Sequence, residues 1–143
     1  MKILSYARGQ TLLEVLVALS VGILVLTAMT GAVLSSLANA QFSKNQNLAT
    51  LYAQQGMENM RDLRNKNWTS FSGYDGFYCL AKDGSLTAGS SCSGNIDGFF
   101  ARQIMFENLA VDKRRITVTV SFTDSKVNHQ SQLISVFTNW NVQ

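Results

Sequence analysis

The feature that most constrains this chain is an apolar run close to its N-terminus. No Lys, Arg, Asp or Glu occurs from Val15 to Ser43, and Glu14 is the only charged residue from Leu12 to Ala40. A bilayer core of about 30 Å needs roughly 20 such residues in a helix. A core helix of a soluble domain rarely stays apolar on all sides for this long, and residues 66–143 would be too few to bury it. The run therefore predicts a membrane-spanning helix.

The charges that flank the run predict its orientation. Lys2 and Arg8 precede it, and the next cation, Lys44, lies well past its end. Positive charge is retained on the cytoplasmic side, so the N-terminus is expected inside and the bulk of the chain outside a single-pass cytoplasmic (inner) membrane segment. The net charge of +3 falls to +1 without Lys2 and Arg8. A nearly neutral body gives little electrostatic reason to expect a nucleic-acid partner.

An ordinary secretory signal is the main alternative interpretation of the run. Ala38-Asn39-Ala40 is a small-x-small site that would leave Gln41 as the new N-terminus. The apolar region of such a signal is about 7–15 residues long, and this run is about twice that length. Two rival functions therefore stay open: a binding module released after Ala40, and a single-pass membrane protein whose outer domain binds a ligand.

The residues around Glu14 favour a more specific interpretation. The segment Arg8-Gly9-Gln10-Thr11-Leu12-Leu13-Glu14-Val15-Leu16 resembles the processing site of type IV prepilins and pseudopilins. In that family a short basic leader ends in Gly, a prepilin peptidase cuts after it, the new N-terminal residue is methylated, and the fifth mature residue is Glu. The resemblance implies cleavage between Gly9 and Gln10, methylation of Gln10, and an assembly or register role for Glu14 and Thr11.

The resemblance also implies an organisation and a set of partners. Residues 1–9 would be the leader, and residues 10–40 the membrane and assembly half of a long helix. The partners would be other pilin subunits, the prepilin peptidase, the pilus assembly platform and, before assembly, the membrane. The mature protein would be a structural subunit, not an enzyme, in a cell-surface pilus or a periplasmic pseudopilus. Its C-terminal pattern resembles the minor subunits of the V or I/J type. The chain departs from the family by having Gln10 where Phe is usual, and by having no Pro in the helix.

A physical reason exists for a carboxylate at this depth. Cleavage after Gly9 would leave an α-amine on Gln10, which is positively charged at neutral pH. A buried Glu14 can be neutralised by such an amine from a neighbour or from its own chain. Breaking a buried pair by removing one partner costs about 3–5 kcal/mol. We hypothesise that this pair sets the axial register between subunits.

The pattern after residue 40 predicts that the helix continues and then meets a sheet. Small and apolar residues recur at helical spacing up to about residue 65, which gives residues 41–65 one face to bury: Ala49, Ala53, Gly56, Met60 and Leu63. A short strand is expected at Phe77–Leu80, and alternation predicts three clearer strands around 100–106, 116–122 and 133–140. The fold class is therefore α+β: a long N-terminal helix whose outer half packs on a small antiparallel sheet formed by residues 66–143, as in the pilin fold.

The remaining candidate groups do not form a recognisable reactive site. Cys79 and Cys92 are expected to form a disulfide if the domain is outside, and two free thiols are the alternative. Their spacing and a single His make no metal site, so no metal and no cofactor is expected. His129 falls in an expected polar turn at 128–131, and Lys113–Arg115 in an expected solvated turn. No catalytic residue is assigned.

Overall fold

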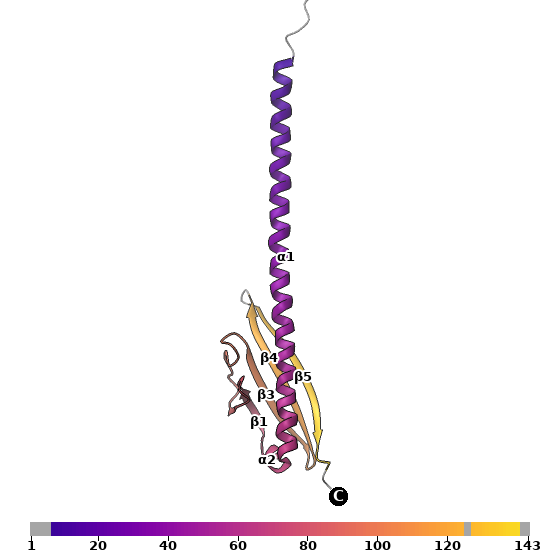
Figure 1. Ribbon diagram of the computed structural model, residues 1–143, viewed down its shortest axis with the longest axis vertical. Coiled ribbons are helices and arrows are strands. Elements are labelled where there is room, and N and C mark those ends of the chain that lie inside the picture. The colour runs from indigo at the N-terminus through magenta and orange to yellow at the C-terminus, as the bar shows by residue number, and fades with distance from the viewer. Residues whose placement is uncertain (1–6, 125–126, 141–143) are drawn as a thin grey trace, which may run out of the picture. The chain divides into compact units, whose positions relative to one another are not determined.

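The structure is a computed structural model that describes residues 7–124 and 127–140, with side chains described from Thr11 onward. The elements, in chain order, are α1 (Ala7–Lys66), α2 (Trp68–Ser72), β1 (Gly76–Leu80), β2 (Leu86–Ala88), β3 (Ala101–Ala110), β4 (Lys113–Asp124) and β5 (Val127–Thr138) (Figure 1). One long N-terminal helix is followed by an antiparallel sheet, so the predicted α+β class is confirmed. Contacts divide the chain into two units, Met1–Gln41 and Phe42–Gln143, which we describe separately.

The first unit consists, in its described part, of the N-terminal turns of α1. Its large apolar side chains are all exposed, from Leu12 to Leu37. The described side chains of residues 11–41 are all exposed, so this part of the helix forms no core of its own.

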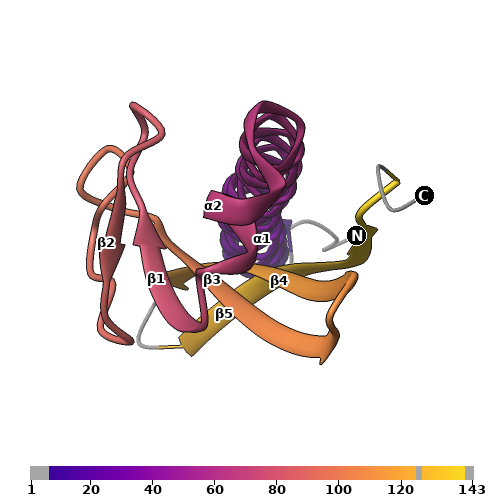
Figure 2. The ribbon, with the colours of Figure 1, turned by 90° about the horizontal axis from the view of Figure 1, so that it is seen from below.

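The second unit is a helix-on-sheet sandwich. Its sheet has the strand order β2-β1-β3-β4-β5, and every neighbouring pair is antiparallel. Figure 2 shows α2 and the end of α1 on one face of this sheet. The helical stripe predicted from the sequence supplies the helix side of the core, since Ala49, Ala53 and Met60 are at most 1% exposed. The predicted packing of this half of the helix on the sheet is confirmed.

Strict alternation accounts for the sheet side of the core. On β4 the inward side chains of Ile116, Val118 and Val120 are completely buried. The inward residues of β3 continue this layer, and aromatic rings close both of its ends. The core consists of Ala49, Ala53, Met57, Met60, Phe71, Leu80, Ile96, Phe100, Ile104, Phe106, Ile116, Val118, Val120, Phe122 and Phe137. On β5, Phe137 faces this core, whereas Ile134 is 60% exposed on the other side of the sheet.

At Gly56, α1 lies very close to the sheet. A Cβ atom at this position would lie 2.9 Å from Cγ1 of Val118 and 3.1 Å from Cδ of Arg102. The helix can sit this close to β3 and β4 because residue 56 has no side chain.

Two expected turns are wrong. The turn between β3 and β4 is at Val111 and Asp112, so Lys113–Arg115 belongs to strand β4. Arg114 is nearly buried there and donates a hydrogen bond to the carbonyl oxygen of Ser72, while Arg115 pairs with Glu107 across the strands at 3.3 Å. Long basic side chains are tolerated in a strand when acceptors such as the Ser72 carbonyl or the Glu107 carboxylate lie within reach. The sequence pattern does not reveal these acceptors.

The expected polar turn around His129 is wrong for a similar reason. Residues 128–131 lie in β5, which begins at Val127. The His129 ring is half-buried between two aromatic rings, 4.8 Å from the centre of Phe42 and 5.3 Å from that of Phe122. Along this edge strand, successive side chains face alternately toward the core and toward solvent, so polar residues can occupy the solvent-facing positions.

Candidate functional site

The first candidate site is the N-terminal segment of α1. Gly9 and Gln10 have helical backbone, and the side chain of Gln10 lies outside the described residues. Thr11 and Glu14 are both exposed and lie three residues apart, which makes them neighbours on the helix surface. A carboxylate is therefore presented within one turn of Gln10, where the proposed new N-terminus would be.

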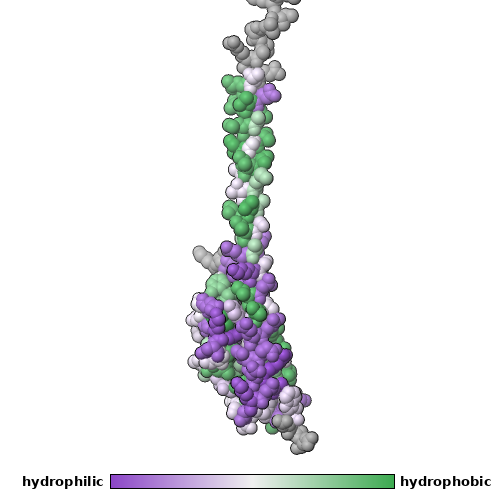
Figure 3. All heavy atoms as spheres, in the orientation of Figure 1, coloured by the Kyte–Doolittle hydropathy of each residue, from purple (hydrophilic) through white to green (hydrophobic). Residues whose placement is uncertain are grey.

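The segment that follows Glu14 presents apolar surface on all sides. The helix is long and apolar enough to cross a membrane, and none of its most apolar window is buried in the structure. Figure 3 shows the visible face of this part of α1 as almost continuously hydrophobic. An exposed apolar surface of this extent requires lipid or protein around it in the cell.

Three hydroxyl groups in this segment, those of Ser20, Thr27 and Thr30, bond to the helix itself. Ser20 Oγ donates to the carbonyl of Val17 at 2.8 Å, and Thr30 Oγ1 donates to that of Leu26 at 2.8 Å. Thr27 Oγ1 reaches two carbonyls of the preceding turn at 2.9 and 3.0 Å. In hydrocarbon an unpaired polar group costs several kcal/mol. These internal bonds make the segment compatible with a lipid environment.

In the described part of the second unit, Arg102 is a deeply buried cation that is 1% exposed. Its Nε donates to the carbonyl of Leu80 at 3.1 Å, its Nη1 to that of Tyr52 at 3.0 Å and its Nη2 to that of Ala81 at 2.6 Å. Asn95 accepts the Arg102 backbone N–H at 2.7 Å and donates to the Leu80 carbonyl at 3.2 Å. Burial lowers the pKa of Arg102. Its partners are backbone carbonyls of α1 and of the end of β1. This arginine therefore links the helix to the sheet, and its role is structural.

The charged cluster around Asp97 is also structural. Asp97 accepts from Nζ of Lys82 at 2.6 Å and from the hydroxyl of Tyr52 at 2.9 Å, and these bonds lower the pKa of its carboxyl. The same contacts raise the pKa of Lys82 and of Tyr52. Asp83 accepts from the backbone N–H and the hydroxyl of Ser85, which lowers its pKa. Each shift keeps a group in its ordinary charge state at neutral pH, as expected of groups that hold loops in place.

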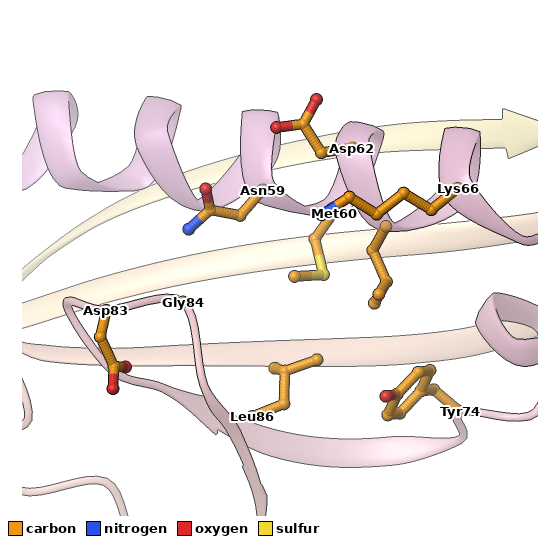
Figure 4. A pocket seen from close by; sticks show the side chains of 9 residues that line it. Asn59, Met60, Asp62, Lys66, Tyr74, Asp83, Gly84 and Leu86 are labelled. Carbon is orange, nitrogen blue, oxygen red and sulfur yellow. The ribbon is translucent and has the colours of Figure 1, made fainter.

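A groove between α1 and the β1–β2 hairpin has a volume of about 340 Å³. Met60, Leu86 and Tyr74 are among the residues that line it. Figure 4 shows that the two carboxylates at the groove, Asp62 and Asp83, lie on opposite sides and point away from one another. They do not form the close pair that general acid and base chemistry would need.

The two cysteines form a disulfide in the structure. The bond joins Cys79 on β1 to Cys92 in the segment between β2 and β3, across 13 residues of sequence. Among the residues that the structure describes, no cluster of three His, Cys, Asp or Glu side chains is placed to hold a metal ion.

Comparison with known proteins found a family match for the N-terminal segment. Residues 4–30 match the family model described as the prokaryotic N-terminal methylation motif. This motif is the hallmark of type IV pilins and pseudopilins. The chain therefore carries this motif in its N-terminal segment. The match covers Gly9, Gln10 and Glu14, the residues that carry the sequence resemblance.

The match has consequences at the level of the family. Pilin-like proteins are structural rather than catalytic, and the motif implies processing by a prepilin peptidase and assembly with other pilins. The apolar N-terminal helix fits a membrane-anchored precursor. No curated protein and no solved structure matches the chain, so the unit Phe42–Gln143 is described from this structure alone.

Sequence reasoning identified the N-terminal motif and missed the contacts made by Arg102 and Arg64. The signal for Arg102 was a charged residue on the apolar face of a strand, between Phe100 and Ile104. Arg64 gave no such signal: its guanidinium lies over the rings of Phe137 and Trp140, more than 70 residues later in the chain.

Proposed function

We propose that this protein is a minor structural subunit of a type IV pilus or a related pseudopilus, made as a membrane-anchored prepilin. The observation that supports this most directly is the methylation motif at residues 4–30, which runs into an apolar helical segment whose most apolar window is 0% buried among the described residues. The precursor would be held in the cytoplasmic membrane with its N-terminus inside and the unit Phe42–Gln143 outside.

Maturation would cut the chain between Gly9 and Gln10 and methylate the new N-terminus. The resulting amine carries positive charge at neutral pH, and Glu14 lies one helical turn from it. A carboxylate in an apolar bundle is stabilised by such a cation and is costly without one. Glu14 and Thr11 would therefore set the register between neighbouring subunits, and the apolar flanks would supply bulk attraction.

The first experiment identifies the N-terminal residue of the mature protein by mass spectrometry. We expect Gln10 as the first residue in cells with an active prepilin peptidase, and the intact precursor in cells without it. Gly9→Leu should block this cleavage. The matched control, Ala38→Leu, disrupts the small-x-small site and should leave cleavage at Gln10 unchanged. A mature N-terminus at Gln41, or an intact Met1 despite an active peptidase, would overturn the proposal.

The second experiment tests the register role of Glu14. Glu14→Val should still be processed, because the cleavage site is intact, but it should be lost from sheared filament fractions. Glu14→Gln keeps the size of the side chain and removes its charge, so it separates electrostatics from packing. Normal incorporation of Glu14→Val would remove the register role while leaving the assignment as a pilin-like subunit intact.

A further inference from the structure

A second cleft lies where α1 ends, α2 begins and β5 ends. Its volume is about 310 Å³. Three short stretches of chain line it, the last residues of α1, the start of α2 and the residues after β5: Arg64, Asn65, Lys66, Asn67, Trp68, Thr69, Thr138, Asn139 and Trp140. The proposed assembly role, which depends on the N-terminal segment, makes no use of it.

The cleft contains both tryptophans of the chain. Trp68 is half-buried, and its ring packs on Phe71 at 5.6 Å, which fixes its position. Trp140 is 69% exposed. The guanidinium of Arg64 lies 4.4 Å from the centre of the Trp140 ring. Since a cation covers one face of this indole and most of the residue is exposed, its remaining surface is open to a ligand.

Arg64 is a cation held in place by rings. It lies 5.3 Å from the centre of the Phe137 ring as well as 4.4 Å from that of Trp140, and Nη1 donates to the carbonyl of Thr138 at 3.5 Å. Its Nε is buried without a hydrogen-bond partner among the described residues. Stacking fixes this guanidinium, and among the described residues no carboxylate forms an ion pair with it.

The polar groups of the cleft point to the class of ligand. Two cations, Arg64 and Lys66, line it, and the described lining residues include no Asp or Glu. The others are amides and hydroxyls that offer both donors and acceptors. The cations favour an anionic ligand, the amides and hydroxyls favour one rich in hydroxyl groups, and the exposed indole of Trp140 favours one with a ring that can stack on it.

We propose that this cleft binds an acidic oligosaccharide, with a sugar ring against Trp140 and its carboxylate next to Lys66 and Arg64. Single-stranded nucleic acid also uses aromatic platforms and cations, but it requires basic residues that track its backbone. Only two cations line this cleft, and the chain beyond Lys2 and Arg8 has a net charge of only +1. The observations therefore favour the glycan.

The test uses the full-length protein in lipid nanodiscs and measures binding on a biosensor surface. The probes are polygalacturonate as the carboxylated glycan, dextran as the neutral glycan and oligothymidylate as the nucleic acid. We expect salt-sensitive binding of polygalacturonate, accompanied by a change in tryptophan fluorescence. Trp140→Ala should weaken binding about tenfold, as loss of one aromatic stacking contact does, and Trp140→Phe should retain part of it. Lys66→Gln should weaken binding and reduce its salt dependence.

Matched controls remove similar groups elsewhere on the same unit. Phe77→Ala removes an exposed aromatic ring on β1, and Lys44→Gln removes an exposed cation of α1, so neither should change binding. Equal binding of dextran, preferential binding of oligothymidylate, binding that survives Trp140→Ala, or no binding by any probe would each overturn the proposal. None of these results bears on cleavage after Gly9, which is measured separately.

Discussion

The close approach of helix and sheet at Gly56 allows a quantitative prediction for Gly56→Ala. Two opposing effects operate. Ala is better than Gly by about 1 kcal/mol in a helix interior, which would stabilise the fold. However, the added Cβ would lie 2.9 Å from Cγ1 of Val118 and 3.1 Å from Cδ of Arg102. Separations this short force a neighbour to move.

Neither neighbour can move easily. Val118 is fully buried in the middle of β4 and is stiff because it is β-branched. Arg102 is held by hydrogen bonds to three carbonyls. Overpacking a core of this kind typically costs about 1–3 kcal/mol. After the gain in helix propensity is subtracted, we expect Gly56→Ala to lower the free energy of unfolding by about 1 kcal/mol, which is a fall in Tm of roughly 4–8 °C for a unit of this size.

The assay is thermal and urea unfolding of the full-length protein in detergent. Both tryptophans lie in the unit Phe42–Gln143, so their fluorescence reports on that unit alone. Gly31→Ala is the matched control, because apart from the adjacent residues and the nearby helix backbone no described atom lies within 4 Å of the added Cβ; it should leave this transition unchanged. In the double variant with Val118→Ala, the closer of the two contacts is removed and that with Arg102 remains, so Gly56→Ala should cost less stability there than in the parent. A stabilising effect of Gly56→Ala on its own would refute the argument.

Three further predictions concern the second unit. Hydrogen bonds from Lys82 and Tyr52 lower the pKa of Asp97, so its ionised form stabilises the fold at any pH above the ordinary carboxyl pKa. This contribution is lost as the pH falls through the lowered pKa. The substitution Asp97→Asn should therefore weaken the decrease of Tm in acid. Replacing Cys79 and Cys92 by Ser should remove about 3 kcal/mol of stability, and a reductant should destabilise the parent but not this variant. Phe71→Ala should cost about 3–5 kcal/mol in urea unfolding, because the ring is fully buried, whereas Phe77→Ala on the exposed sheet face should cost far less.

The parts of the fold that were predictable from the sequence are those with a clear period. Alternation on β4 identified its inward residues, and the helical stripe through Ala53 and Met60 identified the buried face of α1. Both patterns arise because burial repeats with the geometry of the backbone. Elements too short to show a period were missed: α2 has five residues and β2 has three.

Contacts between distant segments were not predictable in the same way. The carbonyls that hold Arg102 belong to residues 21 to 50 positions away in the chain, and every residue has a backbone carbonyl, so the sequence does not show which ones bind. The charges of Lys113–Arg115 are typical of a turn, yet two of these residues find partners that only the tertiary structure brings close. Local composition predicts turns from polarity, and it fails where polar side chains are satisfied by remote groups.

Residues 10–40, the proposed assembly segment, differ from the rest of the chain in the environment that stabilises them. Its backbone is helical, and the hydroxyls of Ser20, Thr27 and Thr30 bond to that backbone. Moving this segment from lipid to a bundle of apolar helices therefore breaks no hydrogen bond within it and exchanges one apolar environment for another. Glu14 is the exception, because a carboxylate must find a cation or a proton wherever hydrocarbon surrounds it. If subunits move from membrane to filament as we propose, the apolar attraction between helices will change little when one helix shifts along its axis. The charge of Glu14 can therefore distinguish one axial register from the next.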